Sequence, residues 1–126
     1  MDEAKKETIG IRPENYSIWH RSLGAEYPAL DIDFVEFRKG KIVAFFGVTG
    51  ILKDESHIVN SKRFIWNRTE VERKILLELS QKVRVPSFFV IHTDDMNLFH
   101  VHKIGEDLTK FTRMNQSEYA DFIKGL

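Results

Sequence analysis

Two strand-like segments that meet at a tight turn constrain the fold of this chain more than any other feature. Residues 30–37 and 41–49 are rich in Val, Ile and Phe, and residues 38–40 between them are typical of a hairpin turn. The second segment is apolar on both faces, as a central strand of a sheet is. With three residues in the turn, odd-numbered residues of both strands share one face, because side chains alternate along a strand.

Helix-start patterns occur at three places along the chain. Pro13 suits a first helical position and is followed by apolar residues at helical spacing, which predicts a short helix from about residue 12. Thr69 with Glu72 predicts a capping box that opens a second helix, and Asn115 with Glu118 predicts a similar box for the last helix.

The remaining segments complete a mixed fold. Residues 87–93 and 98–104 flank the turn DDMN and predict a second hairpin, whereas residues 50–68 read as a long polar loop with a short strand at 63–66. The order is helix, strand, strand, helix, strand, strand, helix (αββαββα). The sequence therefore predicts an α/β chain of the α+β type, in which helices flank a mixed central β-sheet.

The totals favour one intracellular domain. The chain has 126 residues, 19 basic and 19 acidic side chains and no cysteine, so disulfides, thiolate metal sites and a strong global attraction to nucleic acid are not expected. We expect a flexible tail over residues 1–11 and a single domain over residues 12–126. The polar start and the short apolar runs predict a soluble, cytoplasmic protein.

Asp31 and Asp33 form the most distinctive polar pair. Two residues apart on a strand, both carboxylates would leave the same face, and rigidly held carboxylates are what Mg²⁺ or Mn²⁺ prefers. The alternative is a pair of solvated charges at the sheet edge, where Asp is common.

The segments "YSIWHR", "ALDIDFVEFRKGKIVAFFGVTG" and "LLELSQKVRVPSFFVIHTDDMNLFHVHKI" resemble the PD-(D/E)xK, restriction-endonuclease-like superfamily of nucleases over about residues 14–104. In active members, an Asp on the first strand and an Asp/Glu-x-Lys on the second hold divalent ions and orient a hydrolytic water. By this resemblance Asp33 takes the first position, with Asp31 as the near alternative. Gly47 then stands in place of the acid and Thr49 in place of the lysine.

This departure predicts a degenerate active site. Glycine has no ligand atom and threonine has no cation, so Asp33 and Asp31 resemble the remnant of a metal site. Glycine at position 47 would instead let a bulky neighbour approach the sheet. A missing acid or lysine can also be supplied from elsewhere in the fold. The candidates are Glu14, Glu36, Glu55 and Glu72 for the acid, and Lys41 and Lys53 for the lysine.

Two further groups of residues are candidate sites. His100 and His102 alternate on one strand and could bind a transition metal with Asp94 or Asp95, although alternating His on a strand usually has no special role. A basic cluster around Trp66 suggests a nucleic-acid contact, but interleaved acids equally suggest a mixed solvated face. The cluster comprises Lys62, Arg63, Arg68, Arg73 and Lys74.

The sequence therefore predicts a nuclease-like domain without catalysis that binds nucleic acid or a protein, with no cofactor. The alternative is an active DNA endonuclease that uses Mg or Mn and a relocated acid or lysine. A third reading is an interaction protein without a nucleic-acid role, marked by exposed aromatic residues and by homodimerisation along an edge strand at residues 98–104. The aromatic residues in question are Phe45, Phe88, Phe89 and Phe99.

Overall fold

The computed structural model describes residues 14–126, which divide into two compact units. The first ends at Asp31 and the second spans Ile32–Leu126, whereas the sequence predicted one domain from residue 12. The predicted tail at residues 1–11 lies outside the described residues. No helix within residues 14–126 has the length and apolar character needed to cross a bilayer.

The first unit contains the predicted N-terminal helix, α1, at Glu14–Arg21. None of its residues is buried, and its large apolar side chains Tyr16, Ile18 and Trp19 are all more than half exposed. The three rings of Tyr16, Trp19 and His20 contact one another along the helix. The helix is therefore stabilised by local contacts rather than by a core of its own.

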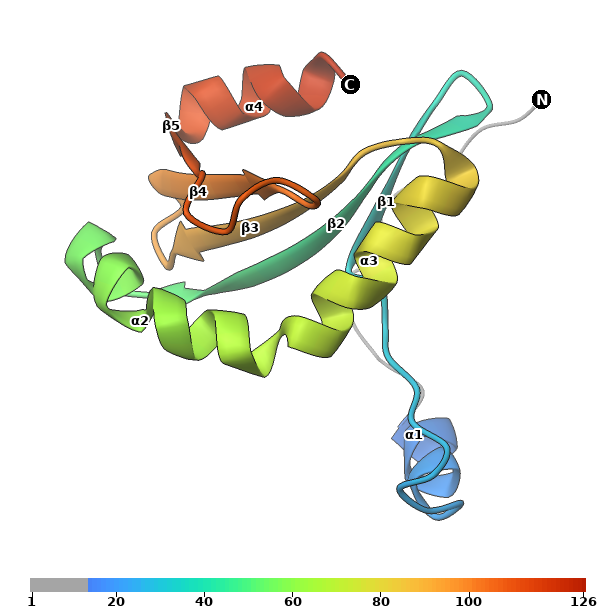
Figure 1. The fold of residues 1–126 in the computed structure, drawn as a ribbon. Coiled ribbons are helices and arrows are strands. Elements are labelled where there is room, and N and C mark those ends of the chain that lie inside the picture. The colour runs from blue at the N-terminus through green and yellow to red at the C-terminus, as the bar shows by residue number, and fades with distance from the viewer. Residues whose placement is uncertain (1–13) are drawn as a thin grey trace. The chain divides into compact units, whose positions relative to one another are not determined.

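The second unit is built on a five-stranded mixed sheet with the strand order β1-β2-β3-β4-β5 (Figure 1). The strands are β1 Phe34–Arg38, β2 Lys41–Leu52, β3 Ser87–Thr93, β4 Leu98–Lys103 and β5 Thr112–Asn115. β2 and β3 are parallel and the other neighbours antiparallel, so the predicted mixed α+β architecture is confirmed. β5 was not predicted, and it makes β4 an interior strand. The edge that was predicted for dimerisation at residues 98–104 is therefore covered.

Helices cover both faces of this sheet. Figure 1 shows α4 (Gln116–Lys124) on one side and α2 (Glu55–Arg68) with α3 (Glu70–Val83) on the other. One core cluster joins Phe46, Val90 and Phe99 to α4, and the other joins Phe89 and Ile91 to α2. From Ala44 to Val48, even-numbered residues of β2 therefore face α4, and Gly47 faces α3. Beyond an irregularity after Thr49, Leu52 packs in the cluster that contains α2.

In the hairpin between β1 and β2, a two-residue turn and a bulge together place residues of equal parity on the same face. The turn has two residues, Lys39 and Gly40, both with positive φ, which suits a tight hairpin turn. A bulge between Glu36 and Phe37 then shifts the register, so that Phe34 pairs with Phe46. The predicted three-residue turn is wrong, but residues of equal parity share a face beyond the bulge, as expected.

The predicted loop at residues 50–68, with its short strand, is also wrong. β2 extends to Leu52, and Asp54 then caps α2 by accepting a hydrogen bond from the His57 backbone N–H at 2.9 Å. Only Ile58 and Ile65 are buried among the residues of α2, so its apolar side is narrow. The helix depends on tertiary burial of these two residues, and for that reason its pattern was not visible in the sequence.

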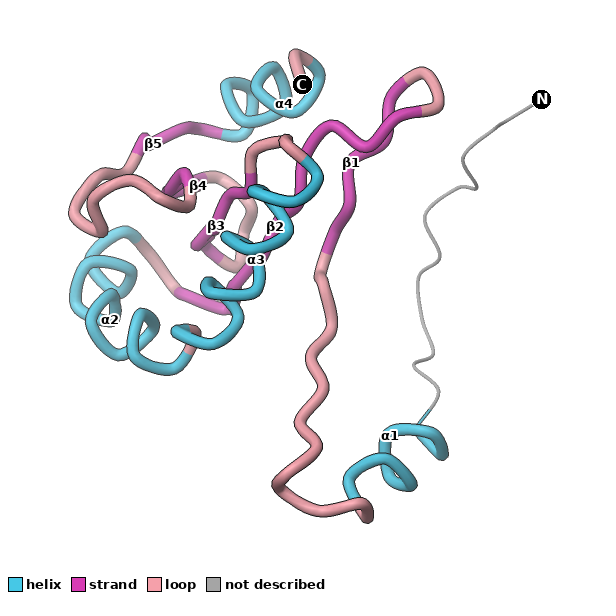
Figure 2. Tube along the Cα trace, turned by 45° about the vertical axis from the view of Figure 1, so that its right-hand side comes forward, coloured by secondary structure: helices cyan, strands magenta, loops and turns pink. Residues whose placement is uncertain are grey.

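The two predicted capping boxes differ in outcome. Thr69 ends α2 and its hydroxyl donates to the Ile65 carbonyl at 2.8 Å, so it makes no side-chain cap for α3. Figure 2 shows α2 and α3 as two separate helices that follow one another along the chain. At α4 the box is confirmed. Asn115 Oδ1 accepts from the Glu118 backbone N–H at 2.8 Å, and Glu118 Oε1 accepts from the Asn115 backbone N–H at 2.9 Å.

We expect Asn115→Ala to lower the free energy of unfolding by about 1 kcal/mol, because the Glu118 backbone N–H at the start of α4 loses its side-chain acceptor. Urea denaturation followed by circular dichroism measures this change. Ser117→Ala, two residues after the cap, is the control and should lower the free energy of unfolding much less. Equal losses for the two variants would contradict a working capping box.

Candidate functional site

Asp33 stands one residue before β1 and is fixed to the neighbouring strand. Its Oδ2 accepts a hydrogen bond from the Val48 backbone N–H of β2 at 2.8 Å, although the side chain is exposed overall. A carboxylate held in this way lies beside the middle of β2. The structure thus brings Asp33 to Gly47 and Val48.

Gly47 is buried on the face of β2 that α3 covers. A Cβ atom at this position would lie 2.7 Å from Glu72 Oε1, 3.0 Å from Leu76 Cδ1 and 3.2 Å from Phe89 Cδ1. These distances leave no room for a side chain without displacing Glu72. The expectation that glycine lets a neighbour approach the sheet is therefore confirmed, and the neighbour is α3.

Glu72 brings its carboxyl group from α3 into the space above Gly47, where it is hydrogen-bonded to Asp33. Burial raises the pKa of Glu72 to about 7, and the negative charge of Asp33 and the hydrogen bond to it act in the same direction. The charge of Arg73 lowers this pKa and opposes the other effects. Below about pH 7 Glu72 therefore keeps a proton next to Asp33.

Of the three candidate replacements for the missing acid that lie in the second unit, the structure brings only Glu72 to Asp33. Glu14 belongs to the first unit, Glu36 pairs with Arg38 at 2.9 Å, and Glu55 binds other side chains. No acid is supplied by the strand itself.

Neither candidate replacement for the lysine lies near Gly47. Lys41 and Lys53 are each six residues from Gly47 along the β2 segment, a separation of about 20 Å in an extended chain. Thr49 is half-buried two residues after Gly47 and has no charge. The site thus pairs two acids that neither of these lysines reaches.

The donor set is also small for a metal ion. Within residues 14–126, no three His, Cys, Asp or Glu side chains are grouped so that they could hold one. Mg²⁺ and Mn²⁺ usually take one or two carboxylates together with water and substrate oxygens, so Asp33 and Glu72 would supply the least that such an ion requires.

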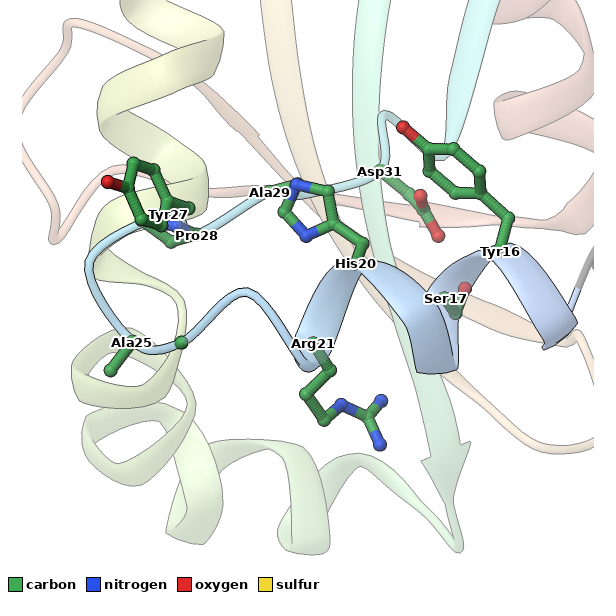
Figure 3. A pocket seen from close by; sticks show the side chains of 10 residues that line it. Tyr16, Ser17, His20, Arg21, Ala25, Tyr27, Pro28, Ala29 and Asp31 are labelled. Carbon is green, nitrogen blue, oxygen red and sulfur yellow. The ribbon is translucent and has the colours of Figure 1, made fainter.

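Asp31, the alternative metal ligand, does not share a strand with Asp33. β1 begins at Phe34, so neither aspartate lies within the strand, and Asp31 belongs to the first unit. There it lines an open hollow of about 580 Å³ together with Tyr16 and His20, as Figure 3 shows. The predicted common strand face for the two carboxylates is therefore wrong.

The predicted histidine site is not assembled. Glu55 Oε2 accepts from His100 Nε2 at 3.1 Å and from Arg113 Nε at 2.6 Å, while His102 Nδ1 lies 2.9 Å from the Lys110 carbonyl. Of the two aspartates proposed with them, Asp94 is exposed and Asp95 accepts from the Thr93 hydroxyl at 2.7 Å. The pair His100 and Glu55 thus ties α2 to β4.

His100 is 6% exposed, and burial lowers its pKa, so that the ring stays neutral against Glu55. Its Nδ1 has no hydrogen-bond partner within the described chain. The network was missed in the sequence because its three members lie 13 to 58 residues apart and α2 was not expected.

The five basic residues of the predicted nucleic-acid surface have different roles. Lys62 lies 3.8 Å above the Phe111 ring, and Arg73 lies 4.6 Å above the Trp66 ring while donating to the Trp66 carbonyl at 2.6 Å. Lys74 pairs with Glu70 at 3.4 Å. Arg63 and Arg68 are exposed on α2, and neither forms an ion pair within residues 14–126. The predicted cluster is thus divided: Lys62 and Arg73 lie over aromatic rings, whereas Arg63, Arg68 and Lys74 are exposed.

We expect the free energy of unfolding to fall as the pH rises from about 4.5 to about 7, because native Glu72 keeps a proton that the unfolded chain has already lost. Glu72→Gln keeps a donor toward Asp33 and should remove this contribution. Urea denaturation at pH 5 and at pH 7.5 measures the difference for each protein.

Glu78→Gln on the exposed side of α3 is the control for this pH dependence and should behave as the wild type, because Glu78 only pairs with Lys82 at 3.7 Å. An unchanged pH dependence in Glu72→Gln would contradict the proton that native Glu72 keeps.

Comparison of the chain with protein-family models, with curated proteins and with solved structures found no match. The family to which the chain belongs is therefore inferred from its own residues, as a proposal.

Proposed function

We propose that this protein is a restriction-endonuclease-like domain that has lost metal-dependent hydrolysis and acts as a nucleic-acid-binding module. The observation that carries the proposal is the occupation of the motif position by α3. Where the second strand of an active member presents an acid, this chain has Gly47 beneath the carboxyl group of Glu72.

The chemistry of the pair agrees with a loss of catalysis. The proton that Glu72 keeps up to about pH 7 competes with a divalent ion for its carboxyl oxygens, because an ion binds carboxylates only in their ionised form. Thr49 gives no charge for orienting or deprotonating water. Loss of a single catalytic group commonly costs several kcal/mol of barrier, and here the cationic group is absent from the strand.

The competing reading as a pure interaction protein has less support. The four phenylalanines proposed as an exposed patch, Phe45, Phe88, Phe89 and Phe99, are all buried. Homodimerisation stays a prediction.

We expect no cleavage when the protein is incubated with Mg²⁺ or Mn²⁺ and single-stranded, duplex or branched DNA at pH 7.5. Gel electrophoresis of labelled strands measures it. Binding of the same DNA, followed by fluorescence anisotropy, should remain and should weaken as salt rises, because phosphate contacts release counterions.

A second candidate function is a divalent-metal endonuclease in which Glu72 replaces the missing acid. The specific observation in its favour is that Glu72 Oε1 lies 2.7 Å from the position of a Cβ on Gly47, so a carboxyl group does reach the motif position from α3. In that case a bound ion would supply charge stabilisation of the transition state, and Asp33 with Glu72 would hold it.

The two functions are separated by single substitutions. If the wild type cleaves DNA with Mn²⁺, and Asp33→Ala and Glu72→Gln each abolish cleavage while Glu78→Gln does not, the enzyme is active and the binding-only proposal fails. Cleavage that survives Asp33→Ala would exclude this site as its source.

A further inference from the structure

We propose that the outer face of α2 is the surface that contacts the phosphate backbone of nucleic acid, an inference that rests on the proposed function and locates it. The outer face consists of Ser56, Asn60, Arg63 and Asn67. Phe64 and Arg68 lie on one flank of this face, with Arg68 about 140° around the helix axis from Arg63. The outer face was hidden from sequence analysis because residues 50–68 were expected to form a loop.

The spacing of these residues makes a continuous stripe. Ser56, Asn60, Arg63 and Asn67 follow one another at intervals of four, three and four residues, which places them on one side of a helix. All are exposed, and the buried residues Ile58 and Ile65 occupy the opposite side. The stripe therefore points away from the sheet.

The stripe offers hydrogen-bond donors and positive charge without a competing acid. From Ser56 to Thr69 the chain contains Lys62, Arg63 and Arg68 but no Asp or Glu. Side chains of Ser, Asn and Arg are those that commonly donate to phosphate oxygens. The surface is thus chemically suited to an anionic ligand although the net charge of the protein is zero.

The acids that flank the stripe are already engaged. At the N-terminal end Glu55 binds His100 and Arg113, and beyond the C-terminal end Glu70 pairs with Lys74. Their charges are therefore partly neutralised by internal partners, and Arg63 and Arg68 remain available to a ligand.

Phe64 adds a feature suited to nucleic acid. Its ring is 62% exposed and lies 5.6 Å from the guanidinium of Arg68. An exposed ring beside a cation can stack on a base while the cation meets a phosphate. At 14 residues, α2 is about 21 Å long, a length that follows the backbone over several nucleotides.

An acidic protein partner fits this face less well. A partner helix is usually bound through a continuous apolar stripe, but the residues of this stripe, Ser56, Asn60, Arg63 and Asn67, are all polar. The centre of the face is polar, so a phosphate backbone matches it better than an amphipathic helix does.

The test is fluorescence anisotropy of a labelled duplex and a labelled single strand of about 20 nucleotides each at low salt. We expect the double variant Arg63→Glu/Arg68→Glu to weaken binding by at least about tenfold. The slope of log affinity against log salt concentration should also become less steep, by the amount that corresponds to the loss of about two phosphate contacts. The matched control, Lys103→Glu/Lys124→Glu, changes the net charge equally at exposed sites away from α2 and should weaken binding by less than about threefold. Circular dichroism of both variants checks that they fold.

Phe64→Ala distinguishes stacking from charge alone. It should weaken binding of the single strand by about tenfold and of the duplex much less, because stacking on a base requires the base to be unpaired. Equal losses would assign Phe64 no stacking role.

Other outcomes would overturn the proposal in distinguishable ways. If the wild type binds DNA and both double variants weaken it equally, nucleic-acid binding stands but the outer face of α2 is not its site. If a poly-glutamate peptide displaces DNA at equal charge concentration, the face is a surface for acidic proteins. If the wild type binds neither probe at low salt, the binding function itself fails. If the wild type cleaves DNA with a divalent metal and the α2 double variant still weakens binding as expected, only the proposed loss of catalysis is overturned.

Discussion

The contact of the Glu72 carboxyl group with Asp33 above Gly47 is the interaction that defines the candidate site of this protein. It requires a strand position without a side chain, a helix that crosses that position closely, and a proton between two acids. α3 is held at this distance by Leu76, which is buried against the sheet, and by the Ser87 hydroxyl, which donates to the Leu76 carbonyl at 2.8 Å. The close packing of α3 on β2 thus depends on the lack of a side chain at position 47.

Cations on the helical side of the sheet are divided between structure and surface. Lys62 and Arg73 cover the rings of Phe111 and Trp66, and burial lowers the pKa of both, which marks them as part of the packing. Arg63 and Arg68 remain on the open side of α2. A count of basic residues along the chain overstates a binding surface wherever some of them stack on aromatic side chains.

Local patterns were reliable where a single element determines them. The strands of both hairpins, α3 and the capping box of α4 follow from alternation, helical spacing and the Asn115–Glu118 pair. α2 was missed because only Ile58 and Ile65 bury its apolar side, and β5 was missed because its four residues have no clear alternation. The box at Thr69 failed because that residue belongs to the end of α2, where its hydroxyl bonds backward to Ile65.

The sequence by itself determined the mixed sheet, the placing of Asp33 beside β2 and the lack of an acid and a lysine at positions 47 and 49, since all of these depend on residue identity and on the period of a strand. Only the tertiary structure decided that Glu72, and not Glu36 or Glu55, meets Asp33, and that Lys62 and Arg73 lie over aromatic rings. These are contacts between elements distant in the chain. They depend on how helices cross the sheet, and side-chain packing across that interface sets the crossing.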